Sequence, residues 1–185
     1  PDAEAGEAEP EGTEEALYDT SSFQKGKVTL CVNRGTVEAD TNVGGIVGHL
    51  AASSMGTSVN VTVTDCYNAG AIKANNNAGG IVGNVQAGHT FRRCYNVGTV
   101  TITETSKDVS KESGGIAAMV TRENTLTDCY YDAAAIACGV SNGNDTTTGK
   151  TAAEMQTADF AALLGDAFKP DRYALVNGGY PLLAW

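Results

Sequence analysis

Charged and aromatic side chains are both scarce in this chain, at 18% and 6% of its residues. A core with so few large side chains must be built from small and β-branched residues. The 12 basic residues are outnumbered by 22 acidic ones, which gives a net charge of -10. Because phosphate backbones bind to basic surfaces, this balance argues against a nucleic-acid partner. No apolar run is long enough for a transmembrane helix.

Signatures of metal and cofactor sites are also missing. None of the five cysteines forms a Cys-x-x-Cys pair, which disfavours a zinc ribbon. The two histidines, His49 and His89, have no cysteine or carboxylate at ligand spacing. We therefore expect neither a metal ion nor a cofactor.

The N-terminal segment differs in composition from the rest of the chain. Residues 1–15 hold six glutamates, one aspartate and two prolines, without a bulky apolar side chain. Such a segment buries too little surface to fold, so we expect residues 1–17 to be an acidic disordered linker. No charged, apolar leader precedes Pro1, and we expect any targeting signal to have been removed or to lie outside this segment.

Glycine, in contrast, is abundant at 22 residues, and much of it belongs to an internal repeat. One block has the pattern Cys-x-Asn-x-Gly-x-Ile/Val and a second begins Gly-Gly-Ile. The first block occupies residues 31–37, 66–72 and 94–100, and the second occupies residues 44–48, 79–83 and 114–118. A shortened fourth copy begins at Cys129. The period is about 28 residues, and seven-residue insertions at 51–57 and 106–112 behave like loops on stacked repeats.

Each copy predicts three short strands and three bends. Apolar and small residues alternate after the double glycine, as in Ile46, Gly48 and Leu50, which is typical of a strand with one buried face. The Asn-x-Gly element supplies a bend, because both residues tolerate left-handed backbone angles. We expect residues 18–150 to form an all-β, right-handed parallel β-helix, or β-solenoid, of about three to four coils.

Equivalent side chains of stacked coils lie above one another. We expect an inward structural ladder of reduced cysteines and a second ladder of asparagine amides. The two ladders would contain Cys31, Cys66, Cys94 and Cys129, and Asn33, Asn68 and Asn96. Parallel side chains on one face rarely reach the torsion that a disulfide needs, so the thiols would act as small apolar fillers.

The C-terminal 35 residues have a different composition and no repeat. Thr151 with Glu154 reads as a capping box that opens a helix, and residues 157–160 read as a second helix start. The last coil of a solenoid exposes apolar core and sheet edges. We therefore expect residues 151–185 to be a small α+β cap over that coil.

The repeated blocks, Cys-Tyr-Asn-x-Gly-x-Ile/Val followed by Gly-Gly-Ile-Val-Gly, resemble GLUG-motif repeats across residues 28–140. Such repeats occur in secreted and surface-anchored bacterial proteins, including adhesin-like proteins and the non-catalytic region of some bacterial immunoglobulin A peptidases. The tail from Asn177 to Trp185 is similar to the segment that often follows the last repeat. The resemblance implies an extracellular β-solenoid and brings no catalytic residues. Copy three departs from the pattern at Ala117 and Ala118.

Two outward columns are the candidates for chemistry or binding. Asp65, Arg93 and Asp128 precede successive cysteines and would form either an exposed ion-pair ladder or the acidic and basic wall of a polysaccharide lyase or hydrolase. Tyr67, Tyr95 and Tyr130 follow the same cysteines. They would form either an aromatic strip that stacks on sugar rings or part of the core.

We expect a non-catalytic extracellular repeat module of a larger bacterial surface or secreted protein. It would act as an adhesion, ligand-binding or stalk segment toward a host protein or glycan, through weak contacts on its strand faces and two insertions. The alternative function is a carbohydrate-active enzyme that uses the Asp65, Arg93 and Asp128 wall.

Overall fold

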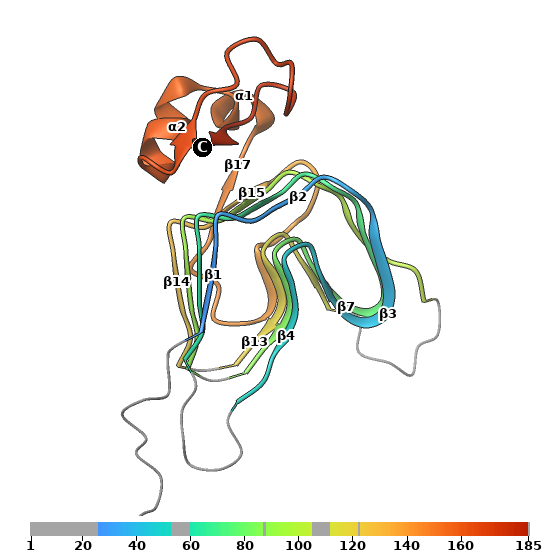
Figure 1. The fold of residues 1–185 in the computed structure, drawn as a ribbon. Helices are drawn as coiled ribbons and strands as arrows, with labels where there is room; N and C mark the ends of the chain where they lie inside the picture. The colour runs from blue at the N-terminus through green and yellow to red at the C-terminus, as the bar shows by residue number, and fades with distance from the viewer. Residues whose placement is uncertain (1–25, 53–59, 87, 105–111, 122, 185) are drawn as a thin grey trace, which may run out of the picture.

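The computed structural model describes residues 26–52, 60–86, 88–104, 112–121 and 123–184. These residues are mostly β-strand, with two short helices near the C-terminus. The four main sheets are parallel throughout (Figure 1). The fold is therefore all-β, as the sequence predicts. The expected linker at residues 1–17 lies outside the described residues.

Each repeat contributes one layer, and every main sheet takes a strand from successive layers. The first layer contains β1 (Lys27–Thr29), β2 (Val32–Asn33), β3 (Val37–Gly44) and β4 (Val47–Leu50). The second contains β5 (Thr62–Thr64), β6 (Tyr67–Asn68), β7 (Ile72–Gly79) and β8 (Val82–Val85). The third contains β9 (Thr90–Arg92), β10 (Tyr95–Asn96), β11 (Val100–Ile102), β12 (Ser113–Gly114) and β13 (Ala117–Val120).

Strand register follows the spacing of the repeats. Lys27 lies opposite Thr62, which lies opposite Thr90, and Thr90 lies opposite Thr125. These offsets of 35, 28 and 35 residues equal the distances between successive cysteines in the sequence. Because a slip of one residue would turn every side chain to the other face, the repeat alone specifies this register.

The first two layers hold four strands each, where the sequence led us to expect three. The extra strand is the two-residue element after each cysteine, such as β6, which is too short to show alternation. It is set off by a sharp corner at the residue before the cysteine. That residue has a positive φ of 49 to 56° in all four copies, at Leu30, Asp65, Arg93 and Asp128. Residues other than glycine rarely adopt this backbone conformation.

The fourth layer is incomplete in the described residues. It contains β14 (Thr125–Thr127), β15 (Tyr130–Asp132) and β16 (Val140–Gly143), but no strand that continues the sheet of β3, β7 and β12. A turn at residues 133–135 takes that place. The next strand, β17 (Thr148–Lys150), pairs with β15 and ends one sheet.

The core runs along the inside of the stack. One cluster of buried side chains joins the second, third and fourth layers and includes Val63, Phe91, Ile81 and Ile116, each 0% exposed. Small and β-branched residues fill most of the remaining positions, in agreement with the scarcity of aromatic residues.

The C-terminal segment begins with α1 (Ala152–Met155) and α2 (Ala158–Leu164) and ends with β18 (Phe168–Lys169) paired to β19 (Leu182–Leu183). The Thr151 and Glu154 capping box is present, and Thr157 caps α2. Neither helix, nor any other in the described residues, is long and apolar enough to cross a membrane.

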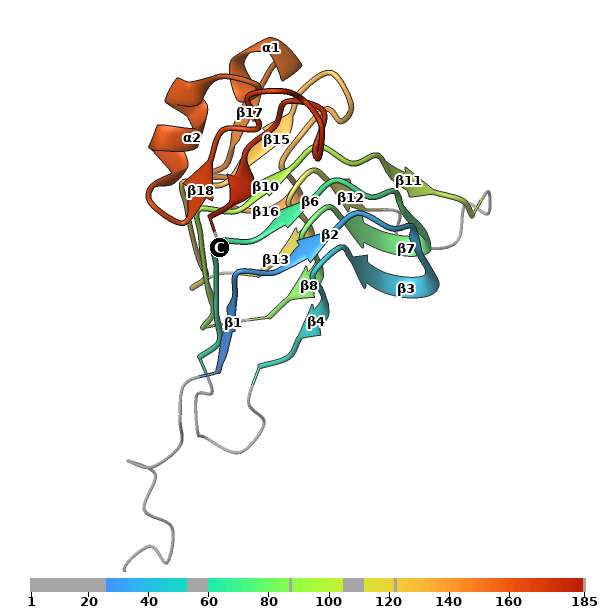
Figure 2. The same ribbon diagram turned by 45° about the horizontal axis from the view of Figure 1, so that its top comes forward.

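This segment lies elsewhere than we expected from the sequence. It packs along the side of the stack, on the outer face of the sheet that contains β6, β10 and β15, instead of over the last layer alone (Figure 2). The tyrosine side chains on that face give it an apolar surface to cover.

Candidate functional site

The four repeated cysteines form a column of thiols whose hydrogen bonds go to backbone carbonyls. Cys66 Sγ donates to the Thr64 carbonyl oxygen at 3.1 Å, and Cys94 Sγ donates to that of Arg92 at 3.4 Å. All five cysteines are free. The neighbouring thiol of Cys94 together with burial raises the pKa of Cys66, and the Cys129 thiol raises the pKa of Cys94. Protonated, buried thiols of this kind are poor nucleophiles.

The repeated asparagines form a hydrogen-bonded ladder. Asn33 Nδ2 donates to Asn68 Oδ1 at 2.7 Å, and Asn68 Nδ2 donates to Asn96 Oδ1 at 2.7 Å. Each side chain also bonds within its own turn, as where Asn68 Nδ2 donates to the Gly70 carbonyl oxygen and Asn68 Oδ1 accepts from Gly70 N. These residues therefore join the layers, and Asn68 uses both its amide oxygen and its amide nitrogen twice, which leaves it no group free for a ligand.

The charged column divides into one tight pair and one loose pair. Arg93 donates to both carboxylate oxygens of Asp65, from Nε at 2.6 Å and from Nη2 at 2.8 Å. Hydrogen bonding to Asp65 raises the pKa of the Arg93 guanidinium. Asp128 instead lies 3.9 Å from Nε of Arg92, and both side chains are about half exposed.

This geometry limits the chemistry of the column. A general base needs a carboxylate oxygen that can reach substrate, whereas both oxygens of Asp65 are held by Arg93 and its side chain is 10% exposed. The pair instead fixes two successive left-handed corners to each other. A hollow of about 420 Å³ lies beside it, lined by Arg92, Arg93, Asp128, Leu163, Gly165, Asp166 and Ala167.

The tyrosine column is covered and does not form an open strip. Tyr67, Tyr95 and Tyr130 are 1%, 0% and 6% exposed. Tyr67 and Tyr95 stack at 4.9 Å, and Phe160 from α2 packs edge-on against Tyr95 and Tyr130. The C-terminal segment thus occupies the surface on which we had considered sugar stacking.

The tail is fastened to this column by polar contacts as well. The Tyr95 hydroxyl donates to the Pro181 carbonyl oxygen, and Asn177 Nδ2 donates to the Tyr95 hydroxyl at 3.0 Å. Burial raises the pKa of Tyr95, so the hydroxyl keeps its proton for this bond. The Asn-Gly-Gly-Tyr-Pro stretch therefore adds hydrogen bonds to the apolar contacts that α2 makes with the same column.

A carboxylate organises the loop that precedes this stretch. Asp171 Oδ2 accepts from the backbone N–H groups of Val176, Asn177 and Gly179 at 3.2, 2.7 and 3.3 Å. Hydrogen bonds from these amides, with that of Asn177 the strongest contributor, lower the pKa of Asp171. The loop is thereby closed around one buried acceptor.

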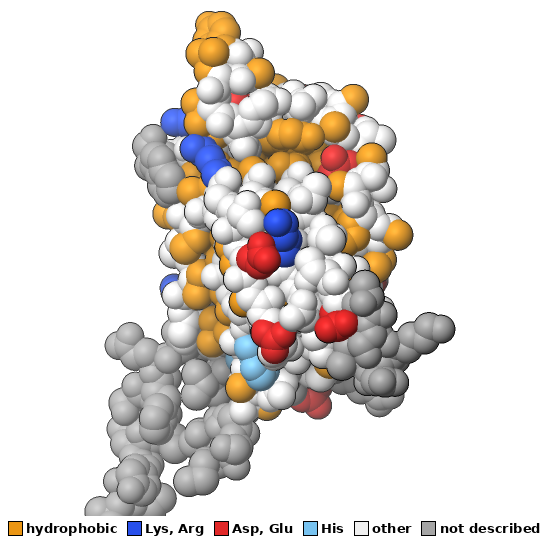
Figure 3. All heavy atoms as spheres, turned by 90° about the vertical axis from the view of Figure 1, so that its right-hand side faces the viewer, with side chains coloured by type: hydrophobic (Ala, Val, Ile, Leu, Met, Phe, Trp, Pro, Cys, Tyr) orange, Lys and Arg blue, Asp and Glu red, His pale blue; other side chains and the backbone are white. Residues whose placement is uncertain are grey.

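The tip of the same loop presents apolar side chains to solvent. Tyr173, Leu175 and Val176 are 80%, 81% and 53% exposed. Hydrophobic side chains gather at the top of the face in Figure 3, over the C-terminal segment, whereas acidic side chains lie mostly lower on it. Exposed apolar groups on a loop with fixed backbone are typical of a binding surface. We call Tyr173, Leu175 and Val176 the apolar tip.

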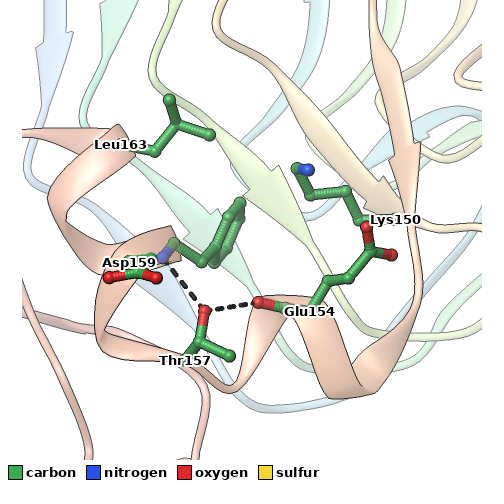
Figure 4. A pocket seen from close by; sticks show the side chains of 6 residues that line it. Lys150, Glu154, Thr157, Asp159 and Leu163 are labelled. Carbon is green, nitrogen blue, oxygen red and sulfur yellow. Dashed lines mark hydrogen bonds between the residues drawn. The ribbon is translucent and has the colours of Figure 1, made fainter.

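A second hollow, of about 380 Å³, lies between the two helix starts (Figure 4). Its polar groups cap the two helices. Thr157 Oγ1 donates to the Glu154 carbonyl oxygen and accepts from Phe160 N. Hydrogen bonds from the Thr151 backbone and side chain lower the pKa of Glu154. The lining therefore consists mainly of helix caps, with Lys150 above the Tyr130 ring.

Most of the insertions at 51–57 and 106–112, which we considered as binding loops, lies outside the described residues. Within the described part of the chain, no three His, Cys, Asp or Glu side chains are grouped as a metal site would require.

Sequence reasoning missed Asp171, Asn177 and the apolar tip. The only local signal was the turn-forming Asn-Gly-Gly run that follows Leu175 and Val176. An isolated apolar pair before a turn reads as a strand end, so exposure could not be inferred from it.

No family model matches this chain, and no curated protein matches it. Among solved structures, the chain is similar to a Bacteroides ovatus protein provisionally named an immunoglobulin A1 protease, with 19% sequence identity and a TM-score of 0.56. The match covers 86% of this chain and 58% of the other, so this chain spans less than two thirds of that protein's length. At this level of identity the likeness concerns the fold.

Proposed function

We propose that this chain is a non-catalytic repeat module of a bacterial surface or secreted protein, and that it binds a host protein or glycan outside the cell. In this proposal the layers are GLUG-type repeats wound into a right-handed parallel β-helix. The module belongs to a longer polypeptide and holds a binding loop at a fixed place on a rigid stack.

The observation that carries the proposal is the apolar tip on a closed loop. Three large side chains remain in solvent while the backbone beneath them is held by Asp171 and Asn177. Preorganised apolar groups bind with little loss of conformational entropy, which is what a recognition loop requires. The repeated residues, in contrast, are used in contacts between layers.

The first test is direct binding. Immunoglobulin A1 is one probe, because the Bacteroides ovatus neighbour is named for it, and an array of host glycans is the other. We expect saturable binding to one of them by the intact chain. The paired substitution Tyr173→Ser and Leu175→Ser should weaken it at least about tenfold, since interface anchors of this type each contribute 1 kcal/mol or more, roughly.

Leu163→Ser is the matched control, because Leu163 is a large apolar residue that is 52% exposed on α2, outside the apolar tip. It should leave binding unchanged. Binding that is equally lost in both variants, or absent for the intact chain, would reject the proposed role and favour a plain stalk.

The alternative function, a carbohydrate-active enzyme, is tested on the same purified chain with polyuronates and host glycans as substrates. Turnover that disappears in Asp128→Asn, the carboxylate of the charged column that lines the 420 Å³ hollow, would replace the binding proposal with a catalytic one.

A further inference from the structure

The middle position of the Asn-x-Gly turn differs between the layers. It is Arg34 in the first layer, Ala69 in the second and Val97 in the third. Ala69 N donates to the carbonyl oxygen of Asn33 at 2.8 Å. Val97 N donates to that of Asn68 at 2.9 Å, so the three turns lie in register. Their middle residues therefore form a column with one cation and two small apolar side chains.

The C-terminal loop lies opposite this column, and the two enclose a third hollow of about 350 Å³. The column forms one wall of the hollow. The other wall is formed by Val176, Asn177, Gly178 and Tyr180. Val176 also belongs to the apolar tip, so the hollow lies directly beside the proposed recognition surface. None of the residues that line it is acidic.

The guanidinium of Arg34 is held from one side. Its Nη2 donates to the Tyr67 hydroxyl at 2.6 Å, and its Cζ lies 5.8 Å from the centre of the Tyr67 ring. The residue is otherwise exposed. A guanidinium has five N–H donors, and within the described part of the chain the bond to Tyr67 is the one side-chain hydrogen bond of Arg34. Several of its donors therefore remain for a ligand.

Arg34 also has no carboxylate to neutralise it among the residues that the structure describes. Other cations of the stack have such partners, namely Lys73 with Glu38, Arg92 with Asp128, and Arg93 with Asp65. The whole chain has a net charge of -10. An arginine that stays unpaired beside a hollow in so acidic a chain is available for an anion from outside.

We propose that this hollow binds a sugar ring that bears a carboxylate, a sialic acid or a uronic acid at the end of a host glycan, an assignment that rests on the binding role proposed above. Arg34 would donate two N–H groups to the two carboxylate oxygens, because a guanidinium and a carboxylate match in a planar, bidentate pair. The apolar faces of the ring would contact Val97 and Val176.

The size of the hollow favours a single ring over a segment of protein. Its volume of about 350 Å³ lies near the lower end of the range for small-ligand pockets, which is about 300 to 1,000 Å³. A helix with its side chains is about 10 Å wide and would not enter. An acidic side chain of a partner protein would reach Arg34 but would leave most of the apolar wall uncovered.

The test compares acidic sugars with their uncharged counterparts on the full chain. The probes are oligosaccharides that end in N-acetylneuraminic acid or in glucuronic acid, and each counterpart carries the methyl ester of the same acid. Isothermal titration calorimetry measures the dissociation constants. We expect one acid to bind at least about tenfold more tightly than its ester, because hydrogen bonds to a charged group are stronger than neutral ones. The acid that shows this preference identifies the source of the carboxylate.

The variant Arg34→Gln should abolish the preference, so that acid and ester bind equally weakly. Lys27→Gln is the matched control, because it removes the same charge from an exposed residue of the same layer that does not line the hollow. It should keep the full preference. Arg34→Lys retains the charge without the planar fork and should keep only part of it.

Absence of binding to both acids, equal binding of acid and ester, or a preference that survives in Arg34→Gln would overturn the assignment. The proposed binding role would still stand if the paired substitution of Tyr173 and Leu175 weakens binding to another probe, so the two failures are distinguishable. Binding of immunoglobulin A1 that falls in Arg34→Gln, while neither acid binds, would also overturn it and would assign Arg34 to an acidic side chain of a protein partner.

Discussion

At the scale of single residues, the repeated side chains act as connectors between layers. Asn68 makes four hydrogen bonds, two within its own turn and two to neighbouring layers, and it is 0% exposed. A side chain that serves four partners cannot be replaced without leaving buried groups unpaired.

We therefore predict that Asn68→Ala lowers the free energy of unfolding by about 2 to 4 kcal/mol, since each buried group left without a partner costs about 1 to 3 kcal/mol. Asn75→Ala is the control, because Asn75 bonds to Asp40 and Thr103 at an exposed site and should cost about 0.5 kcal/mol or less. Urea denaturation measures both. Equal losses in the two variants would contradict a central role for the ladder.

The thiol column predicts a clear division of reactivity. Cys66, Cys94 and Cys129 are at most 1% exposed, whereas Cys31 and Cys138 are partly exposed. In the native protein at pH 8, a thiol reagent should modify Cys31 and Cys138 only, and denaturant should release the other three. Mass spectrometry of the labelled peptides identifies the sites. Rapid native labelling of Cys94 would show that the column opens.

At the scale of elements, the tail and the tyrosine face stabilise each other. Phe160 contacts Tyr95 and Tyr130 and is 3% exposed, whereas Leu163 lies on the same helix and is half exposed. Phe160→Ala should lower the free energy of unfolding by about 3 to 5 kcal/mol through loss of a buried ring. Leu163→Ala should change it by about 0.5 kcal/mol or less. Thermal and urea unfolding distinguish the two variants.

The loop closed by Asp171 predicts a dependence on acid. Its pKa in the folded protein lies below the ordinary value of 3.8, so the stability that it supplies is complete above that value. That contribution is lost as the pH falls through the folded-state pKa. Asp171→Asn should therefore be less stable than the original at pH 7, and the difference should shrink toward pH 2. Melting temperatures from pH 7 to pH 2 measure this; a constant difference would rule it out.

The periodicity of the sequence was sufficient to predict which residues form columns across the layers, but not the backbone conformation at the corners. The columns of Cys66 and Asn68 could be predicted, because stacked copies share one register and each copy carries the same residues. Three bends in each copy were expected, but not the left-handed backbone of the residue before each cysteine, since Leu30, Asp65, Arg93 and Asp128 share no side-chain chemistry.

The burial of Tyr67, Tyr95 and Tyr130 could not be predicted for a different reason. Repeats report which residues share a face, but not what covers it. The covering segment has no repeat, and its contacts to the tyrosines span more than 80 residues, as in the bond from Asn177 to Tyr95.

At the scale of the whole molecule, residues 151–185 complete the stack and are not an appendage. Deleting them should expose the tyrosine face and one edge of apolar surface, which favours self-association. We predict that a chain ending at Lys150 binds a hydrophobic dye and forms oligomers in light scattering, whereas the intact chain does neither. A monomeric, dye-free shortened chain would show that the stack is complete without its tail.

The placement of the tail along the side of the stack also has a mechanical consequence. The hydrogen bonds between layers run parallel to the axis of the stack. A force that pulls the two ends of the stack apart would therefore stretch these bonds directly. The C-terminal segment contacts Tyr67, Tyr95 and Tyr130 of three successive layers, so it connects these layers along the direction of the force. The force would have to detach the C-terminal segment from the tyrosines before those three layers could separate.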